Sequence, residues 1–297
     1  MLQKLTMQIM TLNKPITEII QQRFSCRSYL EKPIEAAKRH KLQDFLASLQ
    51  VGPLGTPLRF HLIAATEQDR DSLKDLGTYG FIQGASGFIV GAVKPAEKDL
   101  EDYGYMMEYI ILVATDLGLG TCWLGGSFTR SSFTKKISAT DEEQVPAVTS
   151  IGYIDNPEEA RNGLIRLQVS ADSRMPWEEL FFHQEFGLPL ARQEAGVYAT
   201  PLEMVRLGPS ASNKQPWRIV KDGCLWHFYL QRTKSYPPSL ASKLLKIADL
   251  QRLDMGIAMC HFELTANELG LIGKWTIQEP VIEKPDELTE YTLSWTS

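Results

Sequence analysis

The strongest constraint on this chain is that one unit of sequence occurs in it twice. The clearest match is ATDLGLGTCW at 114–123, which resembles ANELGLIGKW at 266–275, and each segment stands where a helix would end. Carried backwards, the same register gives further identities in the preceding helix of each copy, namely Asp102 with Asp254, Gly104 with Gly256, and Met107 with Met259. The likeness is therefore not a chance tetrapeptide, and the chain should contain two copies of one fold.

Two further matches lie upstream in each copy. FLASLQVGPLGTPLRFHLI at 45–63 parallels PLEMVRLGPSASNKQPWRIV at 201–220, and each of them reads as a helix, a Gly-Pro loop and a strand. A weaker match pairs PITEIIQQRFSCRSYL at 15–30 with PWEELFFHQEFGLPL at 176–190. Both of these segments begin with proline and an acidic turn, which favours the start of a helix.

Each copy is predicted to run helix, loop, helix, strand, strand, long helix and strand, which is an α+β pattern. The boundary is expected near 170, with a first repeat over 1–170 and a second, shorter repeat over 171–297. The helices predicted at 100–117 and 254–269 are apolar on most faces, so they should be buried and should pack on each other. A fused dimer would relate them by a pseudo-twofold axis.

Composition and charge narrow the class of protein. The chain has 36 acidic and 31 basic residues and a formal charge of −5, so a nucleic-acid partner is not expected. No window reaches the roughly 18 apolar residues of a membrane span. The first residues lack the features of a secretory signal, so we expect a cytoplasmic protein. The cysteines form no C-x-x-C pair, which argues against a metal site and a disulfide framework; they are Cys26, Cys122, Cys224 and Cys260.

The segment RFSCR is a candidate phosphate-binding element. Arg23, Ser25 and Arg27 alternate, so in an extended segment their side chains would point the same way and could converge on one anion. Guanidinium groups match phosphate oxygens in charge and shape, and a hydroxyl adds a neutral hydrogen bond. From these residues alone, a solvated basic turn is an equally good interpretation.

Two loops are candidates for contact with a flat ligand. GPSASNKQPW at 208–217 offers short polar side chains and free backbone amides, although such residues also favour turns for local reasons. GLGTCWLGG at 118–126 has glycines that would end a helix and then let the backbone approach a ligand closely. A further group of glycines at 77–91 does not make G-x-G-x-x-G, so we reject a Rossmann dinucleotide site.

Taken in order, these segments resemble the FMN-dependent nitroreductases, and most closely their single-chain branch with two repeats. The resemblance covers nearly the whole chain and implies a nitroreductase-like α+β sandwich in which two tandem copies form an intramolecular pseudo-dimer. It implies that R-x-S-x-R binds the FMN phosphate, that the Ser-Asn-Gln loop borders the flavin edge, and that the glycine loop lies near the ring. The implied cofactor-binding residues are Arg23, Ser25, Arg27, Leu124, Gly125, Gly126, Arg174, Ser210, Ser212, Asn213 and Gln215.

Only one complete set of these elements exists. In the second copy, the positions aligned with the phosphate segment hold Gln184, Phe186 and Leu188, which cannot bind phosphate through charge. The first copy's loop GPLGTP has lost its Ser, Asn and Gln. The repeat therefore predicts one FMN per chain and a protein that acts as a monomer.

The resemblance implies that NADH or NADPH donates hydride and leaves before a nitroaromatic, quinone or similar small acceptor is reduced at the same flavin face. This is a ping-pong scheme in which the cofactor carries out the chemistry, so no catalytic side chain is assigned. The histidines in apolar runs, at 61, 227 and 261, are interpreted as core residues. A reductive dehalogenase, a flavin-consuming enzyme or a non-catalytic FMN-binding module remains an alternative. The residue that tunes the flavin is open between Lys74 and Arg59.

Overall fold

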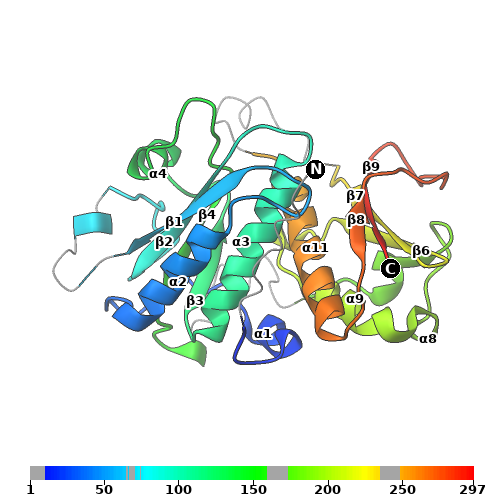
Figure 1. The fold of residues 1–297 in the computed structure, drawn as a ribbon, viewed down its shortest axis with the longest axis horizontal. Coiled ribbons are helices and arrows are strands. Elements are labelled where there is room, and N and C mark those ends of the chain that lie inside the picture. The colour runs from blue at the N-terminus through cyan, green and yellow to red at the C-terminus, as the bar shows by residue number, and fades with distance from the viewer. Residues whose placement is uncertain (1–10, 65, 67–70, 74, 159–172, 235–247) are drawn as a thin grey trace. The chain divides into compact units, whose positions relative to one another are not determined.

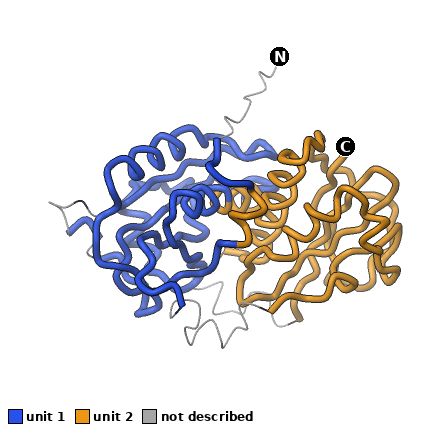
Figure 2. Tube along the Cα trace, turned by 90° about the horizontal axis from the view of Figure 1, so that it is seen from below, with its two compact units in different colours: residues 1–15, 22–99, 109–162 blue, residues 16–21, 100–108, 163–297 orange. Residues whose placement is uncertain are grey.

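The computed structural model describes residues 11–64, 66, 71–73, 75–158, 173–234 and 248–297. The chain divides into two compact units (Figure 2). Unit 1 comprises 1–15, 22–99 and 109–162, and unit 2 comprises 16–21, 100–108 and 163–297. The division after 162 lies near the expected repeat boundary, but two helical segments of the first repeat pack with unit 2. Among the described residues, no helix has the length and apolarity needed to cross a bilayer.

The sheet of unit 1 has four antiparallel strands in the order β1-β2-β4-β3 (Figure 1). These strands are β1 (Leu58–Ala64), β2 (Gly87–Val93), β3 (Gly120–Leu124) and β4 (Val148–Gly152). Among the described residues, the helices that begin in the first repeat are α1 (Ile16–Gln22), α2 (Ala36–Ser48), α3 (Asp99–Asp116) and α4 (Arg130–Lys136), with a 3-10 turn at Asp71–Leu73.

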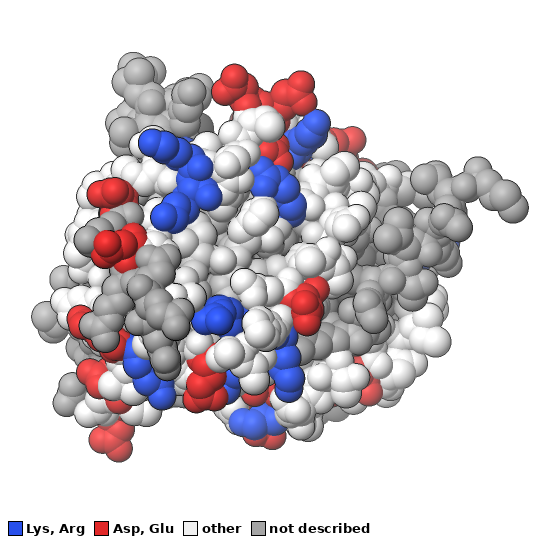
Figure 3. Space-filling view, turned by 60° about the vertical axis from the view of Figure 1, so that its left-hand side comes forward, with Lys and Arg blue, Asp and Glu red and all other residues white. Residues whose placement is uncertain are grey.

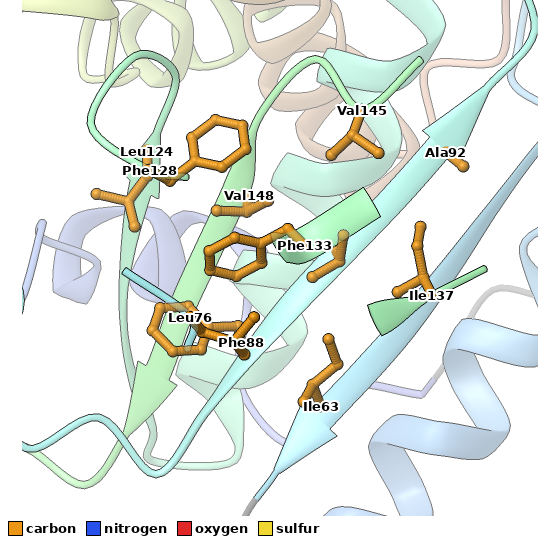
Figure 4. Packing of buried hydrophobic residues seen from close by; sticks show 11 residues of the cluster. Ile63, Leu76, Phe88, Ala92, Leu124, Phe128, Phe133, Ile137, Val145 and Val148 are labelled. Atoms are coloured by element: carbon orange, nitrogen blue, oxygen red, sulfur yellow. The ribbon is translucent and has the colours of Figure 1, made fainter. Parts of the chain in front are cut away.

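Both faces of this sheet are covered. β2 is buried along its whole length, which is typical of a strand with layers on two sides. Figure 4 shows Phe133 of α4 pointing toward Phe88 of β2, and the two rings meet edge to face with centroids 5.1 Å apart. Phe133 also contacts Phe128 edge to face at 5.4 Å. On α2, the periodic Leu42, Phe45 and Leu46 are buried as the sequence predicts.

Unit 2 contains a five-stranded sheet in the order β5-β6-β7-β9-β8. Its strands are β5 (Phe181–His183), β6 (Trp217–Asp222), β7 (Leu225–Gln231), β8 (Lys274–Thr276) and β9 (Thr289–Thr296). The described helices of its second-repeat part are α7 (Trp177–Leu180), α8 (Arg192–Ala195), α9 (Ala199–Arg206) and α11 (Leu250–Glu268), with 3-10 turns at Gly196–Tyr198 and Ala211–Asn213. β5 pairs with β6 in parallel, and the other pairs are antiparallel.

Apart from β5, the two sheets have the same topology. In chain order, β1, β2, β3 and β4 correspond to β6, β7, β8 and β9, and both sets are arranged first, second, fourth, third. In the sequence, the long helix α3 comes between the second and third strands of its set, and α11 comes between the second and third strands of the other set. The α+β fold class and the tandem repeat predicted from the sequence are therefore confirmed. The last strand of each set, β4 or β9, was not foreseen.

The long helices end in the same way. Gly118 and Gly270 adopt left-handed conformations with φ of 74° and 72°. In each case the next residue closes a Schellman turn: Leu119 donates to the Ala114 carbonyl at 2.9 Å, and Leu271 donates to the Ala266 carbonyl at 2.8 Å. Both glycines are thus explained by local backbone geometry, because a residue with a Cβ would be strained there.

The first half of α3 packs on α11 through a reciprocal pair of glycines. A Cβ on Gly104 would overlap the carbonyl oxygen of Leu253, and a Cβ on Gly256 would overlap that of Glu101. In the repeat register, Gly104 matches Gly256 and Glu101 matches Leu253. Each helix thus uses the same two positions toward the other, as expected for an isologous contact. The expected packing of the two buried helices is confirmed over these residues.

Candidate functional site

The segment Arg23–Arg27 is extended and lies beside β3. Ser25 forms a parallel bridge with Thr121, and the Cys26 amide donates to the Thr121 carbonyl at 2.8 Å. Phe24 and Cys26 are buried on one side of the segment, whereas the side chains of the intervening residues are only half-buried. The alternation predicted from the sequence is present. It places the two guanidinium groups and the Ser25 hydroxyl on the same side of the segment.

Arg27 shows how this segment fits an anion. Its Nη1 atom is buried and has no hydrogen-bond partner among the described residues. Leaving a buried donor of a charged group unsatisfied is costly, so such groups nearly always have a partner. Phosphate oxygens suit a guanidinium fork in both charge and geometry. The residues present therefore fit a phosphate group.

The glycine loop follows the strand that this segment borders. Leu124 is the buried last residue of β3, and Gly125 and Gly126 come directly after it, with Gly126 exposed. Because the segment and β3 run in parallel, Arg27 lies toward the end of β3 from which the loop leaves. The phosphate-binding candidates and the ring-binding candidates of unit 1 are therefore neighbours.

The loop at 77–84 contacts the phosphate segment at one end and the residues after the glycine loop at the other. The sequence did not predict this role for it. The loop at 77–84 bonds to the phosphate segment through the main chain of Gln83. Its amide donates to the Arg27 carbonyl at 2.9 Å, and its carbonyl accepts from the Tyr29 amide at 3.0 Å. At its other end, the carbonyl of Gly77 accepts from the Thr129 amide at 3.0 Å, just beyond the glycine loop. This loop exposes Tyr79, whose φ is 50° and whose exposed fraction is 68%. The glycines that we rejected as a Rossmann motif were the available signal for it.

In unit 2, the loop at 208–217 has an unusual backbone. Ser212, Asn213 and Gln215 have φ values of 50°, 54° and 47°, in the left-handed region. Asparagine tolerates this region, but a serine or glutamine there costs on the order of 1–3 kcal/mol. Such strain persists only where the surroundings fix it, and it is concentrated at functional sites. The loop conformation is therefore imposed by its contacts and is not a simple turn preference.

Several hydrogen bonds impose this conformation. Ser210 Oγ accepts from the Gln215 amide at 2.8 Å, and the buried Gln215 side chain accepts from the Met175 amide at 2.9 Å. Asn213 Nδ2 donates to the Ser173 carbonyl at 3.1 Å. Ser210 and Gln215 are thus used within the protein, whereas the exposed Ser212 faces solvent. Of the predicted flavin-edge residues, Ser212 is the exposed one, and Asn213 is half-buried and bonded to Ser173.

Two arginines lie against this loop. Arg174 donates through Nη2 to the Leu207 carbonyl at 3.1 Å, and its Nη1 lies 3.5 Å from Asn213 Oδ1. Arg218 donates through Nη1 to the carbonyls of Gln215 at 3.0 Å and Trp217 at 2.7 Å. Burial lowers the pKa of Arg218 to about 10, and nearby Glu179 opposes this shift, so the guanidinium remains charged at neutral pH. The residue before α7 that the resemblance indicated, Arg174, is therefore in contact with the flavin-edge loop.

The predicted binding residues are divided between the units. Unit 1 contains Arg23, Ser25, Arg27, Leu124, Gly125 and Gly126, and unit 2 contains Arg174, Ser210, Ser212, Asn213 and Gln215. Arg59, one of the two candidates for tuning the flavin, forms a bidentate pair with Glu143 at 2.8 and 2.9 Å, so its charge is already compensated. Lys74, the other candidate, lies outside the described residues.

The histidines fall into two classes. His227 is buried and bonded to Ser294 Oγ at 2.6 Å, and His261 is buried with both ring nitrogens near oxygen acceptors. These two are core residues, as expected. His61 is instead exposed, with its Nε2 2.6 Å from Arg59 Nη1, so the expectation that it is a core residue is wrong. Within the described residues, no group of three or more His, Cys, Asp or Glu is placed to bind a metal.

In the described part of the second copy, the positions aligned with the phosphate segment have a different structure. Gln184–Leu188 forms a turn that is closed by the His183 amide, which donates to the Leu188 carbonyl at 2.8 Å. The preceding strand β5 pairs with β6. Phe186, the position aligned with Ser25, packs edge to face on Tyr229 with centroids 4.9 Å apart. In the first copy the segment borders the third strand of its sheet, whereas here it borders the first. The segment has therefore changed both conformation and edge.

Charged side chains are mixed on the described part of the face in Figure 3. Lys and Arg are interspersed there with Asp and Glu, and they do not gather into a broad field of one sign. The visible, described part of that face thus lacks the basic stripe that binding a polyphosphate chain requires.

Comparison with known proteins gives one family and many solved structures. Residues 15–266 match the family model described as "Putative TM nitroreductase". A structure from Thermotoga maritima, named "putative nitroreductase", is 20% identical and has a TM-score of 0.60 over 95% of this chain and 94% of that one. A nitroreductase family protein from Clostridium difficile is 22% identical over 55% of this chain and 94% of that chain, with a TM-score of 0.41. A nitroreductase with bound FMN from Bacteroides fragilis is 20% identical over 48% of this chain and 89% of that chain, with a TM-score of 0.37. No curated protein matches.

Proposed function

This chain belongs to the nitroreductase family described as "Putative TM nitroreductase", and on that premise we propose that it is an FMN-dependent oxidoreductase. Its electron donor would be NADH or NADPH, and its acceptors would be nitroaromatic compounds, quinones or similar small molecules. One chain would be the working unit, as a monomer in the cytoplasm. The two repeats would span 1–170 and 171–297.

The observation that carries the proposal is the environment of Arg27. Its buried Nη1 lacks a protein partner among the described residues, and it lies on an extended segment beside the strand that leads into Gly125 and Gly126. An anion-binding fork next to a glycine loop is the combination that a flat, phosphorylated cofactor requires. FMN, when bound, supplies a carrier that takes two electrons from one substrate and passes them to another.

The chain's own residues would bind and orient this cofactor. Arg23, Ser25 and Arg27 would hold the phosphate, with the arginines providing charge and Ser25 a neutral hydrogen bond. Gly125 and Gly126 would let the backbone approach the ring because glycine has no Cβ, and Leu124 would anchor the start of this loop as the buried last residue of β3. Ser212 and Asn213 would face the ring edge, while Ser210, Gln215 and Arg174 would act through the loop that carries them.

Anaerobic titration tests the proposal. Purified protein should bind FMN, and NADH or NADPH should bleach the visible absorption of the bound flavin until a nitroaromatic compound or quinone is added. Absence of FMN binding would refute the proposal. Binding without bleaching would identify a non-catalytic FMN module, and consumption of the flavin or release of halide from a halogenated substrate would identify one of the alternative enzymes.

Initial rates test the order of the substrates. We propose that donor and acceptor use the same open face in turn, so a grid of their concentrations should give parallel double-reciprocal lines. Intersecting lines would show that both substrates bind together, which would reject the single-face scheme while leaving the flavin assignment intact.

A further inference from the structure

Two buried side chains on one face of α11 reach the segment that carries the flavin-edge loop. Asp254 and His261 are two helical turns apart and so project from the same face. Both oxygens of Asp254 accept from the Ala211 amide, at 3.0 and 3.2 Å. Among the described residues, this amide is the one hydrogen-bond donor that reaches the Asp254 carboxyl group. The Asp254 side chain of α11 thus binds a backbone amide of the loop.

The second contact lies just before the loop. His261 Nδ1 lies 2.8 Å from the carbonyl oxygen of Met204 in α9, and its Nε2 lies 3.0 Å from Glu108 Oε1. A carbonyl oxygen can only accept, so Nδ1 carries a proton and donates it to Met204. Glu108 and His261 are both fully buried, so the Nε2 contact lies in the interior of unit 2. α11 therefore holds the helix that leads into the loop as well as the loop itself.

The loop needs such contacts because of its backbone. Ala211 directly precedes Ser212, the first of the residues with left-handed φ, and Gln215 is the last. Without a fixed amide at Ala211, the chain could relax toward commoner φ values. Burial raises the pKa of Asp254, and the neighbouring Asp249 and Glu108 add to this shift against the Ala211 hydrogen bond. A neutral carboxyl group still accepts from an amide, so this contact does not require a buried negative charge.

The two repeats differ at one of these positions. Asp254 has a counterpart in Asp102, but His261 corresponds to Tyr109, whose ring packs on Phe45 with centroids 5.0 Å apart. The copy with Tyr109 is the one whose Gly-Pro loop has lost its Ser, Asn and Gln. The histidine thus occurs only in the copy that keeps the polar loop.

We propose that Asp254 and His261 are positioning residues, which hold the loop at 208–217 in the strained conformation that presents Ser212 and Asn213 to the cofactor. The identity of that cofactor rests on the proposed function. The inference that α11 fixes this loop through the Ala211 amide and the Met204 carbonyl does not depend on the proposed function.

Substitutions at Asp254 in the full chain test the amide contact. Asp254→Asn keeps an oxygen acceptor, whereas Asp254→Ala removes it, and Asp102→Ala serves as the matched control in the other repeat. We expect hydrogen exchange of the loop amides to rise by about tenfold or more in Asp254→Ala, with Asn restoring the slow exchange. FMN affinity should fall about tenfold to a hundredfold in the alanine variant, with a change in the visible circular dichroism of the bound flavin.

Two substitutions test His261, because the side-chain amides of asparagine and glutamine each take the place of a different ring nitrogen. His261→Asn places a donor near the position of Nδ1 and should keep loop exchange slow. His261→Gln places its amide near the position of Nε2 and should speed exchange at 204–211. These paired variants remain informative if removal of the whole side chain prevents folding.

The inference is overturned if loop exchange in Asp254→Ala rises no more than in Asp102→Ala, or if Asp254→Asn is as fast as the alanine variant. Equal exchange in the two His261 variants would overturn the Met204 contact. If the wild-type protein binds no FMN, the proposed function fails, while the exchange measurements still decide whether α11 positions the loop.

Discussion

Gly256 lies directly against the main chain of Glu101, with no room for a side-chain carbon between them. Alanine normally stabilises a helix interior relative to glycine by about 1 kcal/mol. Here an added Cβ would overlap the Glu101 carbonyl and would lie 2.6 Å from the Tyr105 amide nitrogen, and both are main-chain atoms that cannot turn away. We expect Gly256→Ala to lower the free energy of unfolding by about 1–3 kcal/mol, measured by urea denaturation.

The reciprocal glycine provides a second test of that contact. A Cβ on Gly104 would overlap the Leu253 carbonyl in the same manner, so Gly104→Ala should destabilise the protein to a similar extent. An alanine variant more stable than the wild type, at either position, would show that the helices separate without cost and would contradict the close packing.

Arg27→Ala should weaken FMN binding by about 1.5–3 kcal/mol, which is the range for a hydrogen bond to a charged group. The fold should survive, because the Nη1 atom of Arg27 has no partner among the described residues and its removal leaves no buried carboxylate behind. Fluorescence titration of FMN measures the change. His61→Ala is the control, since His61 is an exposed residue of β1. Unchanged affinity in the Arg27 variant would reject the assignment of this segment to the phosphate.

The Arg59–Glu143 pair predicts a specific loss of stability in acid. Hydrogen bonding to Arg59 lowers the pKa of Glu143 from 4.5 to about 2, with a further contribution from the Thr140 amide. A carboxyl group whose pKa is lower in the folded state adds stability that is full above its unfolded pKa and is lost as the pH falls through its folded pKa. The wild-type protein should therefore lose more stability than Glu143→Gln between pH 4.5 and about 2. Parallel melting-temperature profiles over that window would disprove the linkage.

Flavin stoichiometry tests the loss of the second site. At the aligned positions of the second copy, the described chain forms the turn at Gln184–Leu188, with Phe186 packed on Tyr229, in place of an extended cationic segment. We expect one equivalent of FMN per chain, measured by flavin absorbance against protein concentration. Two tightly bound equivalents would mean that a phosphate is bound without the Arg-Ser-Arg segment.

Much of the fold was readable from local patterns. The predicted helices at 100–117 and 254–269 correspond to Asp99–Asp116 and Leu250–Glu268, because apolar periodicity and the glycine stop are both local signals. The last strands, Val148–Gly152 and Thr289–Thr296, were missed. Each is inserted between strands that precede it in the sequence, and that order depends on long-range pairing which no local pattern reports.

The candidate site was predictable to a lesser degree. Alternation indicated that Arg23, Ser25 and Arg27 would share one side, and the extended segment beside Thr121 has that form. Composition could not show that Ser210 and Gln215 are used inside the loop while Ser212 faces outward, because this depends on three left-handed φ values. Asp254 was visible only as half of a repeat identity, since its contact with Ala211 spans distant parts of the chain.

The change of sheet edge in the second copy has a consequence for its history. Arginines introduced at 184 and 188 would stand on a turn next to the first strand of that sheet, not on an extended segment beside the third. Reversal would also require Phe186 to leave Tyr229 and the pairing of β5 with β6 to be broken. Point mutations at these positions would therefore not produce an extended arginine segment there, so any adaptation of the second copy toward phosphate binding would also have to rebuild the pairing at its sheet edge.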